Sequence, residues 1–575
     1  MLEMSLRPGL RAFFLVCIFC YGAVSTAPAQ NNPTFYYSIT NAAAKAGFDT
    51  STLPAYASNP TFAQAVNAYF WGYPLEEMWR TQLNVLNNFG FSVNQLFAPG
   101  TINNSTSVVA PNLNVLNATA FLDLSGNNAF VLSVPNTTST GTYNIMQMLN
   151  AYTDVTYSFG TRNFQTSALN NAGGNYLLVG PNYSGPTSFL GTSLSGVVTN
   201  ATAQAWLIGR VQVDPYATST LGGSNTPYSQ LAGGATNAFS LENSKAIVQS
   251  YAVTPLEDFR NGQISAPITV SNPTSAQLVI ASNNASTMTG QAFYQYVGTN
   301  VAYSGLNSVA GQTNNQAAMY ANFSGLGFSS NGYTASTNPA VLSVMNSAAS
   351  NAAAMLTKMG QNTALLNTNV TTSTGWVVST TAGSYSNTYN GWLNAAITAK
   401  VGLGANLAVD ATYPQTTVDS SGNLLNGSKS YTMTFAPGNM PPVEAFWSLT
   451  VYDANGYVVS NTGNTYYGDN VYSLGSMQLM NILGSAYNTS SVSLLLQSEA
   501  PTDSALMPYW LPTPAGEDFE LILRMYFPDG TNSTSSILNG TYTVPGVELV
   551  PEPTASSLAL AGLGALFVFR RRKTS

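Results

Sequence analysis

The sequence predicts a mainly β protein of more than one domain, with helical segments before and between its sheets. Its 575 residues are enough for two or three domains, each with its own core. Short β-rich segments recur between residues 112 and 213, separated by Gly, Asn, Pro and Thr turns, which is typical of a sandwich and not of βαβ units. The stretch Val443–Tyr452 alternates its side chains with the period of two that marks a strand.

The most clearly predicted element is a β-hairpin around Trp447. Trp447 shares one face of its strand with Leu449, and we interpret this face as the core face. Asp453–Gly456 has the composition of a tight turn, so the return strand is expected at Tyr457–Ser460.

A helix pair is expected at Asn59–Asn88. Asn59 suits the N-cap, and the proline after it suits the first helical position. The segment Gly72–Pro74 is expected to break the helix. Glu76 and Arg80 are four residues apart, a spacing that predicts an ion pair on one helix face.

Periodicity and turn residues place the other elements. Strands are expected at Ala120–Leu124, Ala129–Val134, Tyr143–Leu149, Tyr176–Val179 and Trp206–Val213. Helices are expected at Leu241–Gln249, Gln291–Tyr303, Asn338–Lys358 and Tyr389–Val401. The region 225–400 is rich in Asn, Ser and Ala, and we interpret it as a helical cap interrupted by loops.

The composition is poor in charge. Only 7% of the residues are charged, whereas roughly a quarter is usual for soluble domains. The polar surface must therefore consist of amides and hydroxyls, which suits an exported protein that contacts a neutral polymer such as a glycan. A compositional bias of the lineage explains it equally well. The net charge is −7 and no basic cluster occurs in the body of the chain, so nucleic acid is not an expected partner.

The chain contains no histidine, and its only cysteines are Cys17 and Cys20, close to the N-terminus. A Ser-His-Asp triad, a thiol nucleophile in the body and a zinc site with nitrogen or sulfur ligands are therefore excluded. Gly402-Leu-Gly404 lacks the strand-turn-helix context of a phosphate or dinucleotide loop. No cofactor is expected, and the metal option that stays open is a hard cation such as calcium, held by oxygens.

Residues 1–29 have the order of a secretory signal peptide. Arg7 and Arg11 precede the apolar stretch Ala12–Ala23, and Ala27-Pro-Ala29 is a small-residue cleavage site for signal peptidase. Residues 30–59 are interpreted as a lead-in linker.

The C-terminal residues 548–575 also have a recognisable order. Pro551, Glu552 and Pro553 precede the apolar Leu558–Phe569, and a cluster of cations ends the chain. These cations are Arg570, Arg571, Arg572 and Lys573. The pattern resembles the PEP-CTERM sorting signal, which implies export in a Gram-negative bacterium, transient contact with the inner membrane and recognition by an exosortase-type peptidase. The alternative is a plain C-terminal anchor.

Motifs along the body resemble two families of unknown function that occur together. The first set resembles DUF1254: Tyr69–Leu75, Ala110–Leu116, Phe121–Ser125, Val131–Pro135, Met146–Asp154, Gly160–Arg162 and Ile208–Asp214. The second set resembles DUF1214: Gly402–Asn406, Met440–Ser448, Tyr466–Asp469, Trp510–Gly516 and Leu521–Tyr526. The resemblance implies an immunoglobulin-like sandwich at 60–224 and a jelly-roll-like sandwich at 401–546. It implies no established reaction.

Charged positions of these family patterns are partly replaced in this chain. Ala110, Asn114, Asn117, Thr465 and Asn470 stand where relatives tend to carry charged or tyrosine side chains. Other positions are retained: Asn112, Asp123, Tyr143, Gln147, Tyr152, Asp154, Arg162, Trp447, Asp469, Trp510 and Arg524.

The candidate site residues lie in these motif regions. Without histidine, acid–base work needs carboxylates, and the catalytic candidates are Glu444, Asp469 and Asp154. Asp123 and Asp453 follow strands and are expected to cap turns. The ligand-binding candidates are amide and aromatic side chains: Asn112, Asn114, Tyr143, Gln147 and Trp510.

Two functions are compatible with these observations. The first is an exported protein of the cell envelope or extracellular matrix that binds a ligand or polymer, such as a glycan, without catalysis. The second is an exported carboxylate-dependent hydrolase or lyase that acts on a polymer. No strong catalytic motif occurs in the chain, which favours the first.

The tail allows a direct test. Leu558–Phe569 is only twelve residues long, against roughly 20 for a full crossing, so Thr554–Ser557 must enter the membrane too. The cations should stay cytoplasmic, which leaves Pro551–Pro553 at the outer face, within reach of the peptidase. Intact-mass spectrometry of protein from its native cells should find a mature form that lacks both residues 1–29 and the terminal cations. A single mature form that keeps Arg570–Lys573 would show a permanent anchor.

Overall fold

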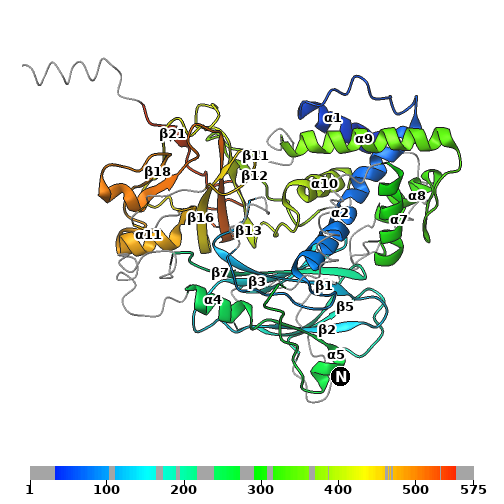
Figure 1. The fold of residues 1–575 in the computed structure, drawn as a ribbon, viewed down its shortest axis with the longest axis horizontal. Coiled ribbons are helices and arrows are strands. Elements are labelled where there is room, and N and C mark those ends of the chain that lie inside the picture. Colours follow the sequence, from blue (N-terminus) through cyan, green and yellow to red (C-terminus); the bar gives the residue numbers. More distant parts are fainter. Residues whose placement is uncertain are drawn as a thin grey trace, which may run out of the picture.

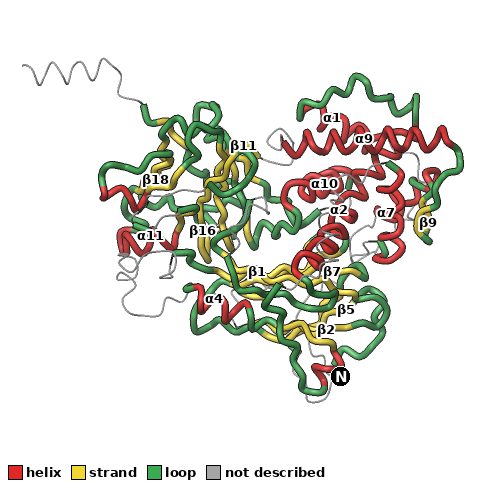
Figure 2. The backbone as a smooth tube through the Cα atoms, viewed as in Figure 1, coloured by secondary structure: helices red, strands yellow, loops and turns green. Residues whose placement is uncertain are grey.

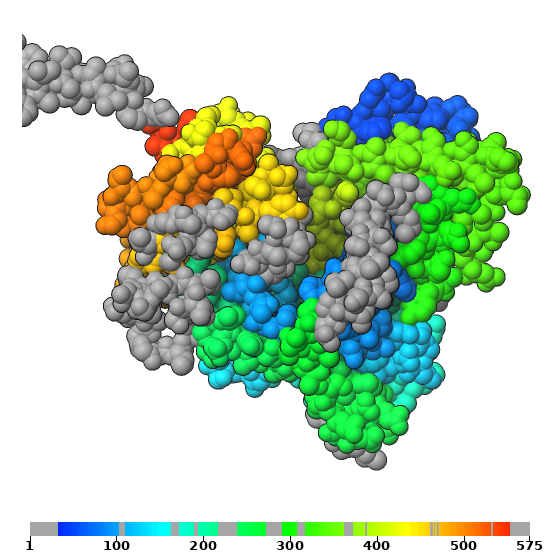
Figure 3. Space-filling view, viewed as in Figure 1, coloured from blue at the N-terminus to red at the C-terminus, as the bar shows by residue number. Residues whose placement is uncertain are grey.

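In the computed structural model, the described residues form several β-sheets, none of them closed, and a group of helices beside them (Figures 1 and 2). The structure describes residues 33–102, 110–162, 172–188, 194–216, 239–271, 290–306, 315–361, 370–385, 388–459, 464, 466–467, 471–530 and 533–551. Three parts are apparent: a helical lobe, a first sheet pair built from β1–β8, and a second sheet pair built from β11–β21. Figure 3 shows the helical lobe (blue and green) and the second sheet pair (yellow and orange) as distinct lobes at the top of the view.

The long helix α2 (Pro60–Phe89) is central to the helical lobe. The side chain of Asn59 accepts a hydrogen bond from Phe62 N at 3.0 Å, which confirms the predicted N-cap. The predicted break at Gly72–Pro74 is wrong, because the helix continues through Pro74. This part of α2 is buried, so packing offsets the hydrogen bond that Pro74 cannot donate.

In the described part of the chain, five other helices pack around α2: α1 (Pro33–Lys45), α7 (Gln291–Ser304), α8 (Asn315–Asn322), α9 (Pro339–Gln361) and α10 (Tyr389–Gly402). Of these helices, α7, α9 and α10 are the ones predicted from sequence. The linker expected at 30–59 is partly wrong, because α1 is a regular helix with Phe35 and Ile39 fully buried in the shared core. Short strands β9 (Phe328–Ser329) and β10 (Gly332–Tyr333) form a small hairpin beside α7.

The first sheet pair shares one core between two four-stranded sheets. One sheet has the order β1-β7-β3-β4: β1 (Val115–Asp123), β7 (Gln204–Gln212), β3 (Asn144–Asn150) and β4 (Val155–Gly160). The other has the order β6-β5-β2-β8: β6 (Gly196–Thr199), β5 (Gly174–Val179), β2 (Ala129–Val134) and β8 (Ala252–Pro255). Helices α4 (Leu241–Val248) and α5 (Leu256–Arg260) lie beside them. All five strands predicted in this region are confirmed.

The second sheet pair encloses a separate core. Its larger sheet contains β11 (Val370–Thr371), β12 (Val377–Val378), β14 (Gln415–Thr416), β20 (Phe519–Pro528), β16 (Val443–Asp453) and β17 (Ser473–Gly475), and β13 (Ala411–Thr412) also pairs with β20. Its smaller sheet contains β19 (Trp510–Pro512), β18 (Val492–Gln497), β15 (Tyr431–Phe435) and β21 (Val547–Leu549). Helix α11 (Ser476–Leu483) follows β17.

The hairpin predicted after Trp447 is only partly present. The turn forms, since Asp453 N donates to Tyr457 O at 2.8 Å, but the return strand is reduced to one bridge between Tyr452 and Val458. Strand β16 pairs instead with β20 and β17. Pairing with a distant, strongly apolar strand therefore takes the place of the predicted return strand, although the turn itself forms.

Both faces of β16 and β20 are buried. Trp447 is fully buried in the core of the second sheet pair, as predicted, and its indole N–H donates to Tyr487 at 2.8 Å. On the opposite face, Phe446 and Tyr526 stack at 4.3 Å between ring centroids and contact Tyr143 of the first sheet pair. This face is the interface that joins the two sheet pairs.

A buried ion pair crosses the same interface. Arg162, just after β4, pairs with Asp410, just before β13, and their side chains are 4% and 0% exposed. Asp410 Oδ2 also accepts a hydrogen bond from Ser158 Oγ at 2.6 Å. Two sequence-distant segments are thereby held by charge in a region that water does not reach.

Removing either partner of this pair should be strongly destabilising. Arg162→Met or Asp410→Asn leaves one buried charge uncompensated, and each should lower the free energy of unfolding by about 3–5 kcal/mol. The double variant should lose clearly less than the sum, because no lone charge remains. Urea unfolding of all four proteins measures this cycle. Strictly additive losses would show that the two side chains act independently.

Candidate functional site

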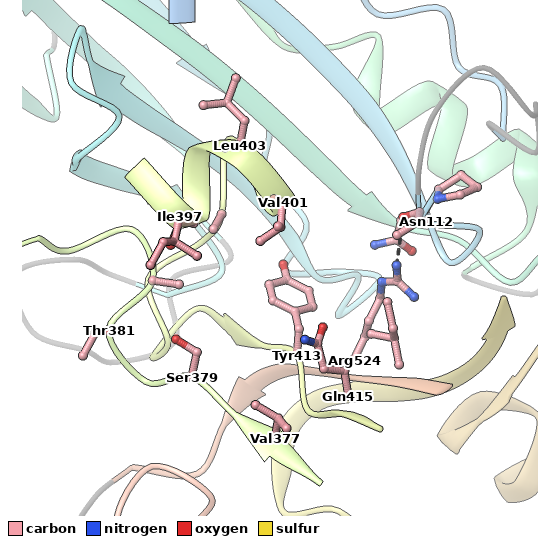
Figure 4. Close-up of a pocket in the computed structure, with 18 of the residues that line it drawn as sticks. Asn112, Val377, Ser379, Thr381, Ile397, Val401, Leu403, Tyr413, Gln415 and Arg524 are labelled. Carbon is pink, nitrogen blue, oxygen red and sulfur yellow. Dashed lines mark hydrogen bonds between the residues drawn. The ribbon is translucent and has the colours of Figure 1, made fainter. Parts of the chain in front are cut away.

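A cavity of about 410 Å³ lies where the helical lobe and the two sheet pairs meet. Its lining comes from segments 110–117, 377–382, 394–405, 413–415 and 522–524, together with Arg210. Figure 4 shows Tyr413, Gln415 and Arg524 on one side of the cavity, Asn112 beside Arg524, and Ile397, Val401 and Leu403 of the α10 segment across from them. No single segment of the chain could form this cavity.

Arg524 of β20 lies deep in the lining and is 5% exposed. Its guanidinium donates to Ala110 O at 3.0 Å and to Thr450 Oγ1 at 3.3 Å, and it lies 5.4 Å from the ring centroid of Tyr452. Burial acts to lower the pKa of Arg524, but Tyr452 and neighbouring tyrosines raise it above its ordinary value. The side chain therefore stays charged.

Arg210 of β7 is the second cation of the lining. It donates to Gln147 Oε1 at 3.0 Å and to Gly404 O at 3.1 Å. Gln147 in turn donates to Gly404 O and Ala405 O, both at 3.1 Å. Gln147 thus orients Arg210 and the loop after α10 from behind the cavity.

Tyr413 and Asn112 complete the polar side. Tyr413 donates to Asn406 Oδ1 at 2.7 Å, and burial raises its pKa, although Arg210 and Arg524 act in the opposite direction. Asn112 lines the cavity as well and donates to the hydroxyl of Tyr526. The tyrosine hydroxyls are neutral here, so the polar side carries net positive charge.

Of the ligand-binding residues predicted from sequence, the structure brings only Asn112 to the lining of this cavity. Gln147 is fully buried behind the lining, where it bonds Arg210. Asn114 is fully buried and accepts a hydrogen bond from Ser473 Oγ at 3.0 Å, away from the lining. Tyr143 is buried in the interface and donates to Asp410 O at 3.3 Å. Trp510 is 1% exposed and donates to Gln497 O, so its ring is buried and does not line the cavity.

The structure does not bring the carboxylate candidates together in one site. Glu444 is exposed at the start of β16, and Asp469 lies outside the described residues. Asp123 and Asp453 cap turns, as predicted, by accepting from Ser125 N at 2.9 Å and Asn455 N at 2.8 Å. Among the described residues, no group of three acidic, histidine or cysteine side chains is placed to hold a metal ion.

Asp154 lies at a second, very small cavity of about 10 Å³, large enough for about one water molecule. Its carboxylate accepts from Tyr385 N at 3.0 Å. Burial raises the pKa of Asp154 to about 7, while the hydrogen bonds from Tyr385 and Asn150 act to lower it. The indole nitrogens of Trp71 and Trp392, which line the same cavity, have no hydrogen-bond partner within the described structure.

Sequence reasoning did not select Arg210, Arg524 and Tyr413 as site residues. Arg210 lies in the DUF1254-like motif Ile208–Asp214, and Arg524 lies in the DUF1214-like motif Leu521–Tyr526. A usable signal was present, because a cation in the middle of the apolar strand Leu521-Ile-Leu-Arg-Met-Tyr526 is unusual in a chain with so few charges.

Three segments of the chain match known families. Residues 91–221 match the family described as "Protein of unknown function (DUF1254)", and residues 410–530 match "Protein of unknown function (DUF1214)". Residues 549–573 match the "PEP-CTERM protein-sorting motif". The three resemblances stated from sequence are confirmed, while the signal peptide lies outside the described residues. No helix among the described residues is long and apolar enough to cross a membrane, and the expected tail helix is not among them.

The fold is similar to a solved structure. The VPA0106 protein from Vibrio parahaemolyticus aligns with a TM-score of 0.56 and 16% identity, over 85% of this chain and all of that one (100%). An uncharacterised protein from Burkholderia cenocepacia aligns with a TM-score of 0.34 and 9% identity, over 91% of this chain and 97% of that one. No curated protein matches the chain.

The carboxyl of Asp154 should make stability depend on pH. Its pKa is about 7 in the folded chain and about 3.9 in an unfolded one, so the folded chain binds more protons between these values. Stability should therefore fall as pH rises from 4 to 7. In Asp154→Asn this slope should be shallower by up to about 1.4 kcal/mol per pH unit, measured by urea unfolding from pH 5 to 8. Glu257→Gln, on the surface of α5, is the control, and a slope shared by all three proteins would contradict the assignment.

Proposed function

We propose that this exported chain, with its DUF1254 and DUF1214 segments and its PEP-CTERM motif, binds a small polar molecule in the cavity between its three parts. The observation that carries the proposal is the cavity itself. Its volume of about 410 Å³ is in the usual range of small-molecule sites. Junctions between domains are common places for such sites, and here each part of the fold contributes polar side chains.

Binding is favoured over the carboxylate-dependent catalysis considered from sequence. The described lining of the cavity contains two arginines and no Asp or Glu. Glycoside cleavage usually needs two carboxylates on either side of the substrate. Glu444 is exposed elsewhere, and Asp154 lies at the separate small cavity. The ligand is therefore held, and nothing in the lining is suited to cleave it by that route.

The finer assignments of location and fold are part of the same proposal. Signal peptidase would remove residues 1–29, and an exosortase-type peptidase would act at Pro551–Pro553 after transient insertion of the tail in the inner membrane. The mature protein would then belong to the cell envelope or the extracellular matrix. The two sheets around each core support a sandwich in both regions, immunoglobulin-like in the first and jelly-roll-like in the second.

Blocking the cavity provides the test. A Cβ added at Gly402, which lines the cavity, would meet no atom within 4 Å, and the backbone there is not in the left-handed region. Gly402→Trp is therefore chosen to place a large side chain at the cavity. Gly530 is equally open but lies outside the lining, and Gly530→Trp is the matched control. We expect thermal-shift screening of sugars, amino acids and organic acids to find compounds that stabilise the wild type and Gly530→Trp but not Gly402→Trp. Compounds that stabilise all three equally, or no stabilising compound at all, would refute the proposal.

A further inference from the structure

We infer that the molecule bound in this cavity is an organic carboxylate, whose anionic group is held by Arg524 and Arg210. This inference rests on the proposed function and adds the chemical class of the ligand.

Arg524 is a buried cation without an ion-pair partner among the described residues. Ala110 O and Thr450 Oγ1, which accept hydrogen bonds from its guanidinium, are both neutral. The neutral side chain of Tyr452 interacts with the guanidinium as well, and the five N–H groups of an arginine leave donors for a further acceptor. A cation that is 5% exposed and has no counter-charge is costly to bury, and a ligand anion in the adjoining cavity would remove that cost.

Arg210 repeats the arrangement on the opposite sheet pair. Its acceptors are the side-chain amide oxygen of Gln147 and the main-chain oxygen of Gly404, again without charge. These contacts fix the guanidinium plane while leaving N–H groups for a ligand. A guanidinium fixed in this way matches a planar carboxylate, which can accept two parallel hydrogen bonds.

The nearby acidic groups are not available to neutralise this pair. Asp410 is already paired with Arg162 and bonded to Ser158. Glu520 lies four residues before Arg524 on β20, forms no ion pair with it and does not line the cavity. Its charge acts on Arg524 only through space: burial raises the pKa of Glu520, and Arg524 acts to lower it. The cavity therefore presents an uncompensated positive field, which favours an anion.

The remainder of the lining defines the rest of the ligand. The hydroxyl groups of Ser379, Thr381 and Thr398 can bond hydroxyls of the ligand, while Val377 and Ile397 contact its carbon skeleton. A hydroxylated acid, such as a sugar acid, has this combination of one anionic and several hydroxyl groups. A phosphate ester shares the anionic chemistry, but the described lining contains no lysine, and its segment Gly402–Gly404 ends helix α10 and does not open a helix as a phosphate loop does.

The test compares glucuronate with glucose, which differ in the carboxylate, by titration calorimetry at constant ionic strength. We expect glucuronate to bind wild-type protein and glucose to bind at least tenfold more weakly. Arg524→Gln and Arg210→Gln should each weaken glucuronate binding about 10- to 100-fold, the usual effect of losing a charge-assisted hydrogen bond. Arg260→Gln removes an exposed arginine of α5 outside the lining and should leave the affinity unchanged.

Each outcome separates this inference from the proposed function. If neutral sugars bind as well as glucuronate and Gly402→Trp abolishes both, the cavity binds ligands but the carboxylate assignment is wrong. If inorganic phosphate binds more tightly than every carboxylate in a panel of acetate, malate and glucuronate, the class is phosphate instead. Absence of binding by that whole panel also overturns the inference. Because Arg524 is buried, the melting temperature of each variant is measured first, and Arg210→Gln alone decides if Arg524→Gln does not fold.

Discussion

The buried ion pair between Arg162 and Asp410 is the interaction on which the placement of the cavity depends. Asp410 holds the first sheet pair through Arg162 and Ser158, and its main-chain oxygen accepts hydrogen bonds from Tyr143 and from Phe527 N. Asp410 therefore bonds residues at the start of β3, at the end of β4 and at the end of β20. Tyr413 follows Asp410 by three residues, so the polar side of the cavity is positioned by this charge.

Strand β20 shows how a chain with few charges can build a polar site inside an apolar fold. Leu521, Leu523 and Met525 face the core of the second sheet pair. Arg524 and Tyr526 face the other way, towards the first sheet pair. The strict alternation of a strand allows one segment to stabilise a core and to supply a site residue at once. Burial of the large apolar surfaces on either side of Arg524 offsets the free-energy cost of burying its charge.

Local patterns predicted the elements well and the assembly poorly. The expected strands and helices lie within a few residues of β1, β2, β3, β5, β7, α4, α7, α9 and α10. Two of the errors have one cause, because both the helix break at Pro74 and the return strand at Tyr457 were predicted from local signals that tertiary packing overrides. The cavity could not be predicted, since its five segments span residues 110–524 and no spacing in the sequence encodes their meeting. Only the isolated cation in β20 pointed to it.

Helix α10 lies between the larger cavity and the small cavity at Asp154. Ile397, Thr398 and Val401 line the larger cavity, whereas Trp392 and Ala395 line the small cavity at Asp154. The segment before α10 does the same, because Thr381 and Ala382 belong to the larger cavity and Tyr385 N donates to Asp154. A carboxyl that gains a charge near pH 7 therefore lies behind the same helix and loop that enclose the arginine pair. Ionisation of Asp154 and binding of a ligand in the larger cavity both act on helix α10 and the segment before it. The two should therefore be measured together.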